Sequence, residues 1–224
     1  MDYNKIIKQA ADAILKPQGL FRKGSSRVWI DDNGWFLILV EFQPSGWDKG
    51  SYLNVAVHFL WTEQKCLTYD FSSGGPRING FVAFDGNEEK FLLDMQGLAN
   101  RALEKVEEYR KFRNLDYACA VRLGSEYGAD VHKVYQKMMI CGLCKDVRAA
   151  RYFEELRELV REPQFAWIQD IKEELDEAIV PIIGDPQALY TYILDKIREN
   201  RRTLRTKPSM KKMKQSFPFN GESL

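Results

Sequence analysis

Apolar residues recur at helical spacing in the first segment of the chain. Six of them lie three or four positions apart and define one face of a helix: Ile6, Ile7, Ala10, Ala11, Ile14 and Leu15. Pro17 and Gly19 follow, and both residue types end helices. The pattern therefore predicts an amphipathic helix that ends before Pro17.

Beyond this helix the spacing of apolar residues changes to the alternation that is typical of strands. We predict strands over residues 27–30, 35–43, 52–61 and about 78–84. Asn33-Gly34 predicts a tight hairpin turn between the first two strands, and residues 44–50 form a loop between the second and third. These signals favour a sheet of about four antiparallel strands.

A trial register tests whether the sheet has one apolar face. A two-residue turn at Asn33-Gly34 pairs Trp29 with Ile38, and the next loop pairs Phe42 with Leu53. The second hairpin then places three further apolar pairs on the same face: Val40 with Val55, Ile38 with Val57, and Phe36 with Phe59. We predict that this face is the core and that the first helix covers it.

After Asp85 the apolar period becomes about 3.6 residues, which is the period of an α-helix. We predict helices over residues 85–109, 115–123, 129–141, 145–161, 164–180 and 186–203. The fold class is therefore α+β, with an N-terminal helix on an antiparallel sheet and an all-helical C-terminal half. We expect residues 1–86 to form the helix and sheet, 87–205 to pack on them in one compact domain, and 206–224 to form a basic, flexible tail.

The second face of the predicted sheet is mixed. Glu41 lies across from Asn54, and Leu37 lies across from His58. This face and the adjoining loop supply the candidate binding residues, which are Glu41, Gln43, Trp47, Tyr52, Asn54 and His58. Either later helices cover the apolar part of the face, or the face binds a ligand. Trp47 is either an exposed contact residue or an anchor packed against the sheet edge.

Several motifs resemble an uncharacterised, mainly bacterial family of unknown function. They are Gly19-Leu-Phe-Arg-Lys-Gly24, Gln43-Pro-Ser-Gly-Trp47 and Tyr52-Leu-Asn54-Val. The resemblance covers residues 1–62 best. The chain departs from the family pattern at Glu41-Phe42 and at Ala56. The resemblance implies an α+β N-terminal part and a bacterial source, but no activity.

The charge of the chain is unevenly distributed. The whole chain carries a net charge of +1, yet residues 196–214 contain nine Lys or Arg and one Glu. Such a basic segment is a candidate for contact with nucleic acid or with an anionic surface. The residues that would make this contact are Arg22, Lys23, Arg27, Arg201, Arg202, Arg205, Lys211 and Lys212. The other interpretation is a solvated extension.

The cysteines provide one motif with redox or metal spacing, Cys141-Gly-Leu-Cys144. A zinc site would need two more ligands, and Cys119 and His132 do not stand at a recognisable spacing from this motif. We therefore interpret the two cysteines as small, half-buried residues and expect no metal or other cofactor.

We expect a non-enzymatic, cytoplasmic recognition module that binds a protein partner or a second copy of itself, with no membrane segment. The first alternative is nucleic-acid binding through the basic residues. The second is an enzyme with an unfamiliar site on the mixed sheet face.

Overall fold

The computed structural model describes residues 2–62 and 67–215. The chain divides into two compact units, Met1–Arg110 with Arg201–Leu224, and Lys111–Asn200. We refer to the first as the sheet unit and to the second as the helical unit. Within the described residues, no helix has a stretch that is long and apolar enough to cross a membrane.

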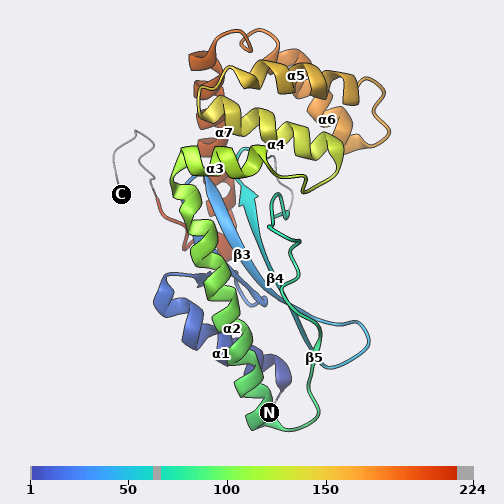
Figure 1. The fold of residues 1–224 in the computed structure, drawn as a ribbon. Helices are drawn as coiled ribbons and strands as arrows, with labels where there is room; N and C mark the ends of the chain where they lie inside the picture. Colours follow the sequence, from blue (N-terminus) through green and yellow to red (C-terminus); the bar gives the residue numbers. More distant parts are fainter. Residues whose placement is uncertain (1, 63–66, 216–224) are drawn as a thin grey trace. The chain divides into compact units, whose positions relative to one another are not determined.

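The sheet unit contains one antiparallel sheet in the order β1-β2-β3-β4-β5. Its strands are β1 (Phe21–Arg22), β2 (Val28–Asp32), β3 (Phe36–Gln43), β4 (Gly50–Phe59) and β5 (Val82–Ala83). The two-residue β1 was not predicted, and β5 is shorter than the strand expected over residues 78–84. The antiparallel sheet and the helical C-terminal half confirm the predicted α+β class (Figure 1).

The register of β3 with β4 is as predicted, with Phe42 opposite Leu53 and Glu41 opposite Asn54. In the β2–β3 hairpin the prediction was wrong by two residues, because Trp29 pairs with Val40 and not with Ile38. The cause is a wider turn, in which the backbone N–H of Asn33 donates to the carbonyl of Phe36 over 3.0 Å. A shift of two residues keeps every side chain on its face, so the core face is still the predicted one.

Helix α1 (Tyr3–Leu15) buries Ile6, Ile7, Ala10, Ala11 and Leu15, as its apolar spacing predicted. Its Asp12 accepts a hydrogen bond of 2.8 Å from the indole of Trp29, which places the helix on the Trp29 face of the sheet. Helix α2 (Glu88–Arg110) packs against α1 and against β3 and β4 (Figure 1).

The compact units differ from the expected boundaries at residues 86 and 205. Helix α2 belongs to the sheet unit, since its buried face, which includes Phe91, Met95 and Val106, packs there. Helix α7 (Pro186–Thr206) crosses a unit boundary, because Arg201–Thr206 belongs to the sheet unit.

The segment after α7 was expected to be a flexible tail. Its described part, 206–215, includes the short helix η4 (Pro208–Met210), and it buries Met210 and Met213. The backbone N–H of Lys214 donates to Asp32 in β2 over 2.9 Å. These contacts hold residues 206–215 to the sheet unit, while residues 216–224 lie outside the described part of the chain.

The helical unit contains α3 (Leu115–Leu123), α4 (Asp130–Leu143), α5 (Arg148–Leu159), α6 (Ala166–Glu174) and the first part of α7. A π-helical turn, Leu175–Ile179, continues α6. Gly142 on α4 lets α7 approach closely, since a Cβ at this position would lie 2.5 Å from Ile193 and 2.8 Å from Leu189. Helix α4 is the central packing element of the unit, since it packs most extensively against α5 and also contacts α3.

Candidate functional site

The structure brings together three of the candidate residues on the second face of the sheet. Asn54 donates to Glu41 over 3.1 Å and to Gln43 over 2.8 Å. The hydroxyl of Tyr69 donates to Glu41 over 2.5 Å. Asn54 is buried, whereas Glu41 and Gln43 are half-buried. The antiparallel register produces this cluster, because it sets Glu41 directly opposite Asn54.

Arg77 extends this cluster to the surface. Its guanidinium donates to Gln43 over 2.7 Å and lies 3.8 Å from the centre of the Tyr52 ring. The Tyr52 ring also contacts Phe81 at a centroid distance of 5.0 Å. Arg77 is exposed, so an arginine and an aromatic pair are presented at the turn end of the β3–β4 hairpin, where Gln43 pairs with Tyr52. Sequence reasoning missed Arg77 because it was part of a loop with no regular pattern.

His58 is not part of this cluster. Its Nδ1 lies 3.0 Å from a carboxylate oxygen of Asp70, and both side chains are fully buried. The same carboxylate accepts the backbone N–H of Phe59 over 2.7 Å and the hydroxyl of Thr68 over 2.6 Å. The Nε2 of His58 has no hydrogen-bond partner among the described residues. His58 and Asp70 therefore join β4 to the segment that follows it.

Trp47 stands apart from the cluster as well, in the turn between β3 and β4. Its side chain is 95% exposed, so it is not an anchor against the sheet edge. The turn is nevertheless ordered, since the Ser45 hydroxyl accepts the backbone N–H groups of Trp47 and Asp48 over 3.1 Å and 3.3 Å. The tryptophan is thus presented to solvent on a structured turn.

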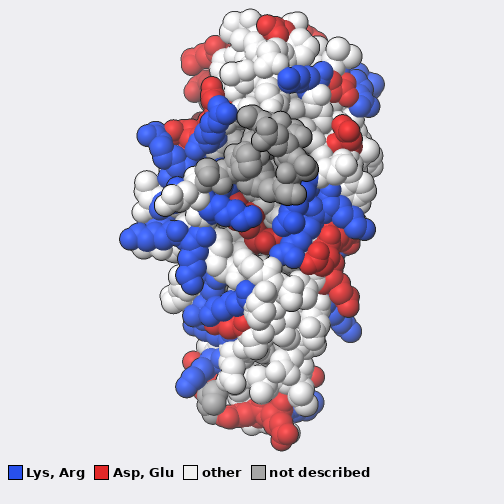
Figure 2. Space-filling view, turned by 90° about the vertical axis from the view of Figure 1, so that its left-hand side faces the viewer, with Lys and Arg blue, Asp and Glu red and all other residues white. Residues whose placement is uncertain are grey.

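The basic candidates fall into two groups. Arg22 and Lys212, which are far apart in the sequence, line one pocket of about 180 Å³ together with Lys16 and Ser209. Lys and Arg side chains gather on the face of the molecule that Figure 2 shows. Asp12 lies 2.7 Å from Lys16 and 4.0 Å from Arg22, and it offsets part of this positive charge.

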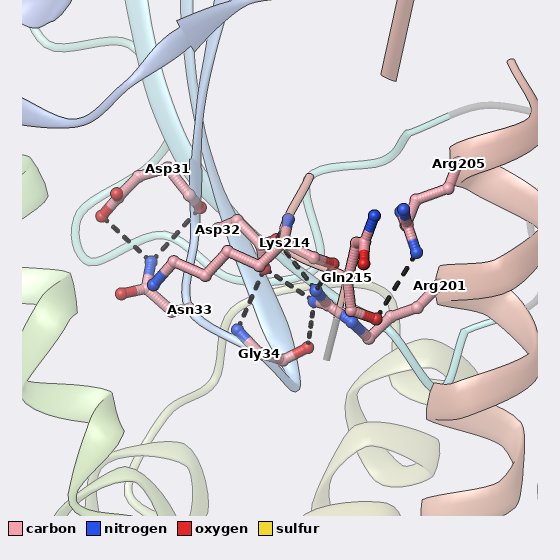
Figure 3. A network of polar contacts seen from close by, with 8 residues as sticks. All are labelled: Asp31, Asp32, Asn33, Gly34, Arg201, Arg205, Lys214 and Gln215. Carbon is pink, nitrogen blue, oxygen red and sulfur yellow. Dashed lines mark hydrogen bonds and ion pairs between the residues drawn. The ribbon is translucent and has the colours of Figure 1, made fainter. Parts of the chain in front are cut away.

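The second group of basic residues is engaged within the protein. Arg201 is buried and donates to both carboxylate oxygens of Asp32 over 2.6 Å and 2.9 Å (Figure 3). It also donates to the carbonyls of Gly34 and Lys214 over 2.8 Å and 2.9 Å. Arg205 reaches the carbonyl of Gln215 over 3.4 Å. Arg201 thus has a structural role.

The remaining basic candidates differ in exposure. Lys23 and Arg27 are half-buried, and Arg202, Lys211 and Lys212 are exposed. Arg27 donates to the carbonyl of Gly50 over 3.4 Å, and burial lowers its pKa. Arg202 and Lys211 are thus accessible to an anionic ligand, as are the residues around the pocket of Arg22 and Lys212.

The helical unit contains a group of thiols that the sequence pattern did not connect. Cys119 on α3 lies beside Cys141 and Cys144, which stand at the end of α4. Hydrogen bonds from Cys141 and Cys144 lower the pKa of the Cys119 thiol, and the same bonds raise the pKa values of the other two thiols. Cys66, the fourth cysteine, lies outside the described residues.

His132 was the other residue considered as a zinc ligand. Its ring nitrogens are not among the ligand atoms that lie close to Cys119 and Cys141. Its Nε2 lies 3.2 Å from the side-chain amide of Gln136, one turn further along α4. The thiols are accompanied instead by Asp146, which the sequence pattern gave no reason to select.

Comparison with protein-family models, curated proteins and solved structures finds no match to this chain, so the resemblance over residues 1–62 stays a prediction.

Proposed function

We propose that this chain is a cytoplasmic recognition module that binds a protein, either a different chain or a second copy of itself, through the β3–β4 hairpin. The observation that carries the proposal is the 95% exposure of Trp47 on a turn that Ser45 orders. Tryptophan is among the residues that contribute most to binding energy in protein interfaces. An ordered turn also loses less conformational entropy on binding than a flexible one.

The strand residues next to this turn support the assignment. Tyr52 and Phe81 contact each other there, and Arg77 lies over Tyr52. Aromatic residues and arginine are the types enriched in the buried centre of interfaces. Gln43 accepts hydrogen bonds from both Arg77 and Asn54, so Gln43 and Asn54 act as supports for Arg77 rather than as first contacts.

The test begins with a photoreactive aromatic residue at position 47 of the full chain. Position 167 is the matched control, since Trp167 is a second exposed tryptophan, 43% exposed, on α6 of the helical unit. We expect a cross-linked partner from position 47 and not from position 167. Sedimentation velocity over a range of concentrations detects the case in which the partner is a second copy.

Binding of the purified partner then measures the contribution of the tryptophan. Trp47→Ala should raise the dissociation constant by about thirtyfold. This corresponds to a loss of about 2 kcal/mol in binding free energy, the size expected of a hot-spot residue. Trp167→Ala should leave the affinity unchanged. Equal binding by the wild-type chain and Trp47→Ala would contradict the proposal, and so would equal cross-linking from the two positions.

A second candidate function is the binding of single- or double-stranded nucleic acid. The observation that favours it is the pocket in which Arg22 and Lys212 meet beside Lys16. Lysine and arginine that neutralise phosphates give an affinity that falls steeply with salt concentration. The basic face in Figure 2 is consistent with such contacts.

Fluorescence anisotropy with labelled nucleic acid tests this second function. Removal of the segment after Asn200 is a poor test, because it also removes Arg201 from Asp32. The double variant Arg22→Gln/Lys212→Gln should instead weaken binding and reduce the slope of log affinity against log salt by about 2. Lys49→Gln, an exposed lysine of the same unit, is the control. Absence of binding by the wild-type chain at low salt would exclude this function.

A further inference from the structure

Three potential metal ligands converge at one corner of the helical unit, and Cys144 stands next to them at the end of α4. The sulfur atoms of Cys119 and Cys141 and a carboxylate oxygen of Asp146 all lie within 4.8 Å of one another. The Sγ of Cys144 donates to the carbonyl oxygen of Leu115, the first residue of α3, over 3.8 Å. Cys119 and Cys141 are buried, while Cys144 and Asp146 are half-buried, which leaves a side open for an ion to enter.

The local backbone explains why these groups meet. Cys141 and Cys144 are three residues apart at the end of α4, so both side chains lie on one face of its last turn. Lys145 then adopts a left-handed conformation, with φ of 55°, and the chain reverses. The backbone N–H of Asp146 donates back to the carbonyl of Cys141 over 2.8 Å. The reversal brings the carboxylate of Asp146 beside the thiols.

The third cysteine comes from a different helix. Helix α3 packs against α4 within the helical unit (Figure 1), and the buried face of α3 includes Ala118, Cys119 and Arg122. Cys119 is thereby directed at the end of α4, 22 residues before Cys141 in the sequence. Two thiols and one carboxylate thus come together, with the thiol of Cys144 one helical turn beyond Cys141.

From this geometry we infer that Cys119, Cys141, Cys144 and Asp146 form a binding site for one zinc ion. Zinc in structural sites takes four ligands in a tetrahedron and favours cysteine sulfur, with carboxylate oxygen as an accepted ligand. With zinc–sulfur bonds of about 2.3 Å, neighbouring sulfur atoms of a tetrahedron lie about 3.8 Å apart. The donor atoms of Cys119, Cys141 and Asp146 therefore need only small movements, whereas Cys144 must turn its thiol from the Leu115 carbonyl to complete the tetrahedron.

Zinc fits this set of ligands better than the other common ions. Calcium and magnesium take six or more oxygen ligands, whereas three of the four donors here are sulfur. An iron–sulfur cluster is held by four cysteines or by cysteines with histidine, and it contains several irons and bridging sulfides. Donor atoms within 4.8 Å of one another converge on a single ion instead.

Arg148 provides outer support for the site. Its guanidinium Nε donates to both oxygens of Asp146, over 3.0 Å and 2.9 Å, and this contact fixes the orientation of the carboxylate. The guanidinium also offsets negative charge, since three thiolates and one carboxylate around Zn²⁺ sum to −2. Binding converts three thiols to thiolates and releases three protons to solvent, so both charge and atoms balance.

The ion would connect α3 to the corner between α4 and α5. Zinc held by residues from both sides of such a corner stabilises the folded unit, because the unfolded chain offers no preformed site. The role is structural, because all four coordination positions are filled by the protein. This inference is independent of the recognition function proposed for the sheet unit.

The test uses the full chain, purified and reconstituted with zinc under reducing conditions. We expect about one zinc per chain by elemental analysis after excess metal is removed. We also expect a higher thermal midpoint with zinc than after chelation. Cobalt(II) provides a direct reading of the ligands, since thiolates around a tetrahedral cobalt give sulfur-to-metal charge-transfer absorption and intense visible bands.

Variants assign the ligands. Cys119→Ser, Cys144→Ser and Asp146→Asn should each lose most of the bound zinc, and Arg148→Ala should weaken zinc affinity by about tenfold to a hundredfold, as expected for an outer-sphere partner. Ala118→Ser is the matched control, because it places a hydroxyl at a buried position next to Cys119 without removing a ligand. It should retain the zinc.

Three results would overturn the site. The first is a folded wild-type chain that binds neither zinc nor cobalt. The second is cobalt binding without the thiolate charge-transfer absorption. This spectrum is measured on the wild-type chain, so the result does not depend on whether any variant folds. The third is a disulfide between two of the three cysteines. Mass spectrometry would find it in metal-free protein that has been freshly isolated from cells with a reducing cytoplasm.

Discussion

The two turns at the ends of β3 contain one tryptophan each, and the two side chains have opposite environments. Trp35 lies in the turn that precedes β3 and is 2% exposed. Trp47 lies in the turn that follows β3 and is 95% exposed. Both turns connect neighbouring antiparallel strands, so connectivity does not account for the difference.

The difference lies in what each turn contacts. The Trp35 ring stacks on Phe59 at 5.6 Å and on Trp61 at 5.3 Å, and Arg201 binds Asp32 and Gly34 beside it. Within the described residues the Trp47 side chain has no such contacts: Ser45 orders the backbone around it, and the turn is joined to its neighbour beyond Trp47, where Phe84 donates to the Lys49 carbonyl over 2.9 Å. One turn is thus fixed by the rest of the sheet unit, while the other holds its own shape and leaves its tryptophan available. This contrast supports a binding role for the second turn.

The largest expected effect is at the buried tryptophan. Trp35→Ala should lower the free energy of unfolding by about 3–5 kcal/mol, because it leaves a cavity beside the stacked rings of Phe59 and Trp61. Denaturant titration followed by circular dichroism measures this loss. A loss below about 1 kcal/mol would show that the aromatic stack contributes little and would remove the contrast between the turns.

An effect of similar size is expected at Arg201. Arg201→Ala leaves the buried carboxylate of Asp32 without its cation, at a cost of about 3–5 kcal/mol in unfolding free energy. Arg198→Ala is the control on the same helix, since its pair with Asp195 is exposed and contributes about 0–1 kcal/mol. Adding Asp32→Asn to Arg201→Ala should recover part of the loss. No recovery would mean that the uncompensated charge is not the cause.

A smaller effect is expected at the glycines of the two turns. Gly34 has φ of +87°, so Gly34→Ala should cost about 1–2 kcal/mol. Gly46, in the Trp47 turn, has no positive φ, and a Cβ added there would meet no atom within 4 Å. Gly46→Ala should therefore be neutral or stabilise by about 0.4–1 kcal/mol, and denaturant titration of both variants measures the difference. Equal costs at the two positions would contradict the contrast in backbone constraint.

The smallest effect is expected at Trp47 itself. Trp47→Ala should change the unfolding free energy by no more than about 0.5 kcal/mol, as is usual for a surface side chain. Thermal unfolding of the variant beside wild type measures the change. A loss of several kcal/mol would make Trp47 an anchor of the fold and would leave the proposed recognition function without its central residue.

The pairing of β3 with β4 could be predicted because a single register places every large apolar side chain on one face. The β2–β3 register could be predicted only to within two residues, since Asn33-Gly34 does not reveal that Asp32 accepts the N–H of Gly34 over 3.1 Å. The polar pair of Glu41 and Asn54 followed from the register. Tyr69 and Arg77 did not, because they come from an irregular segment whose path depends on tertiary contacts.

The same limit applies to charges and thiols. Arg201 and Lys212 belong to one basic run, yet the first is buried against Asp32 and the second is exposed. The amino-acid composition does not predict this difference in burial. It depends on the position of the Asp32 carboxylate, which comes 169 residues earlier in the sequence than Arg201. The spacing of Cys141 and Cys144 is visible in the sequence, whereas their contact with Cys119 requires that α3 pack against α4.

The bond between Arg201 and Asp32 also sets an order of events during synthesis. Asp32 leaves the ribosome early, and its partner follows 169 residues later, after the whole of Lys111–Asn200 has been made. Until then the carboxylate of Asp32 must remain hydrated, and the first hairpin of the sheet cannot reach its final packing. The inserted helical unit can fold while the surrounding unit waits. The sheet unit, whose synthesis begins first, is therefore the unit that completes its folding last.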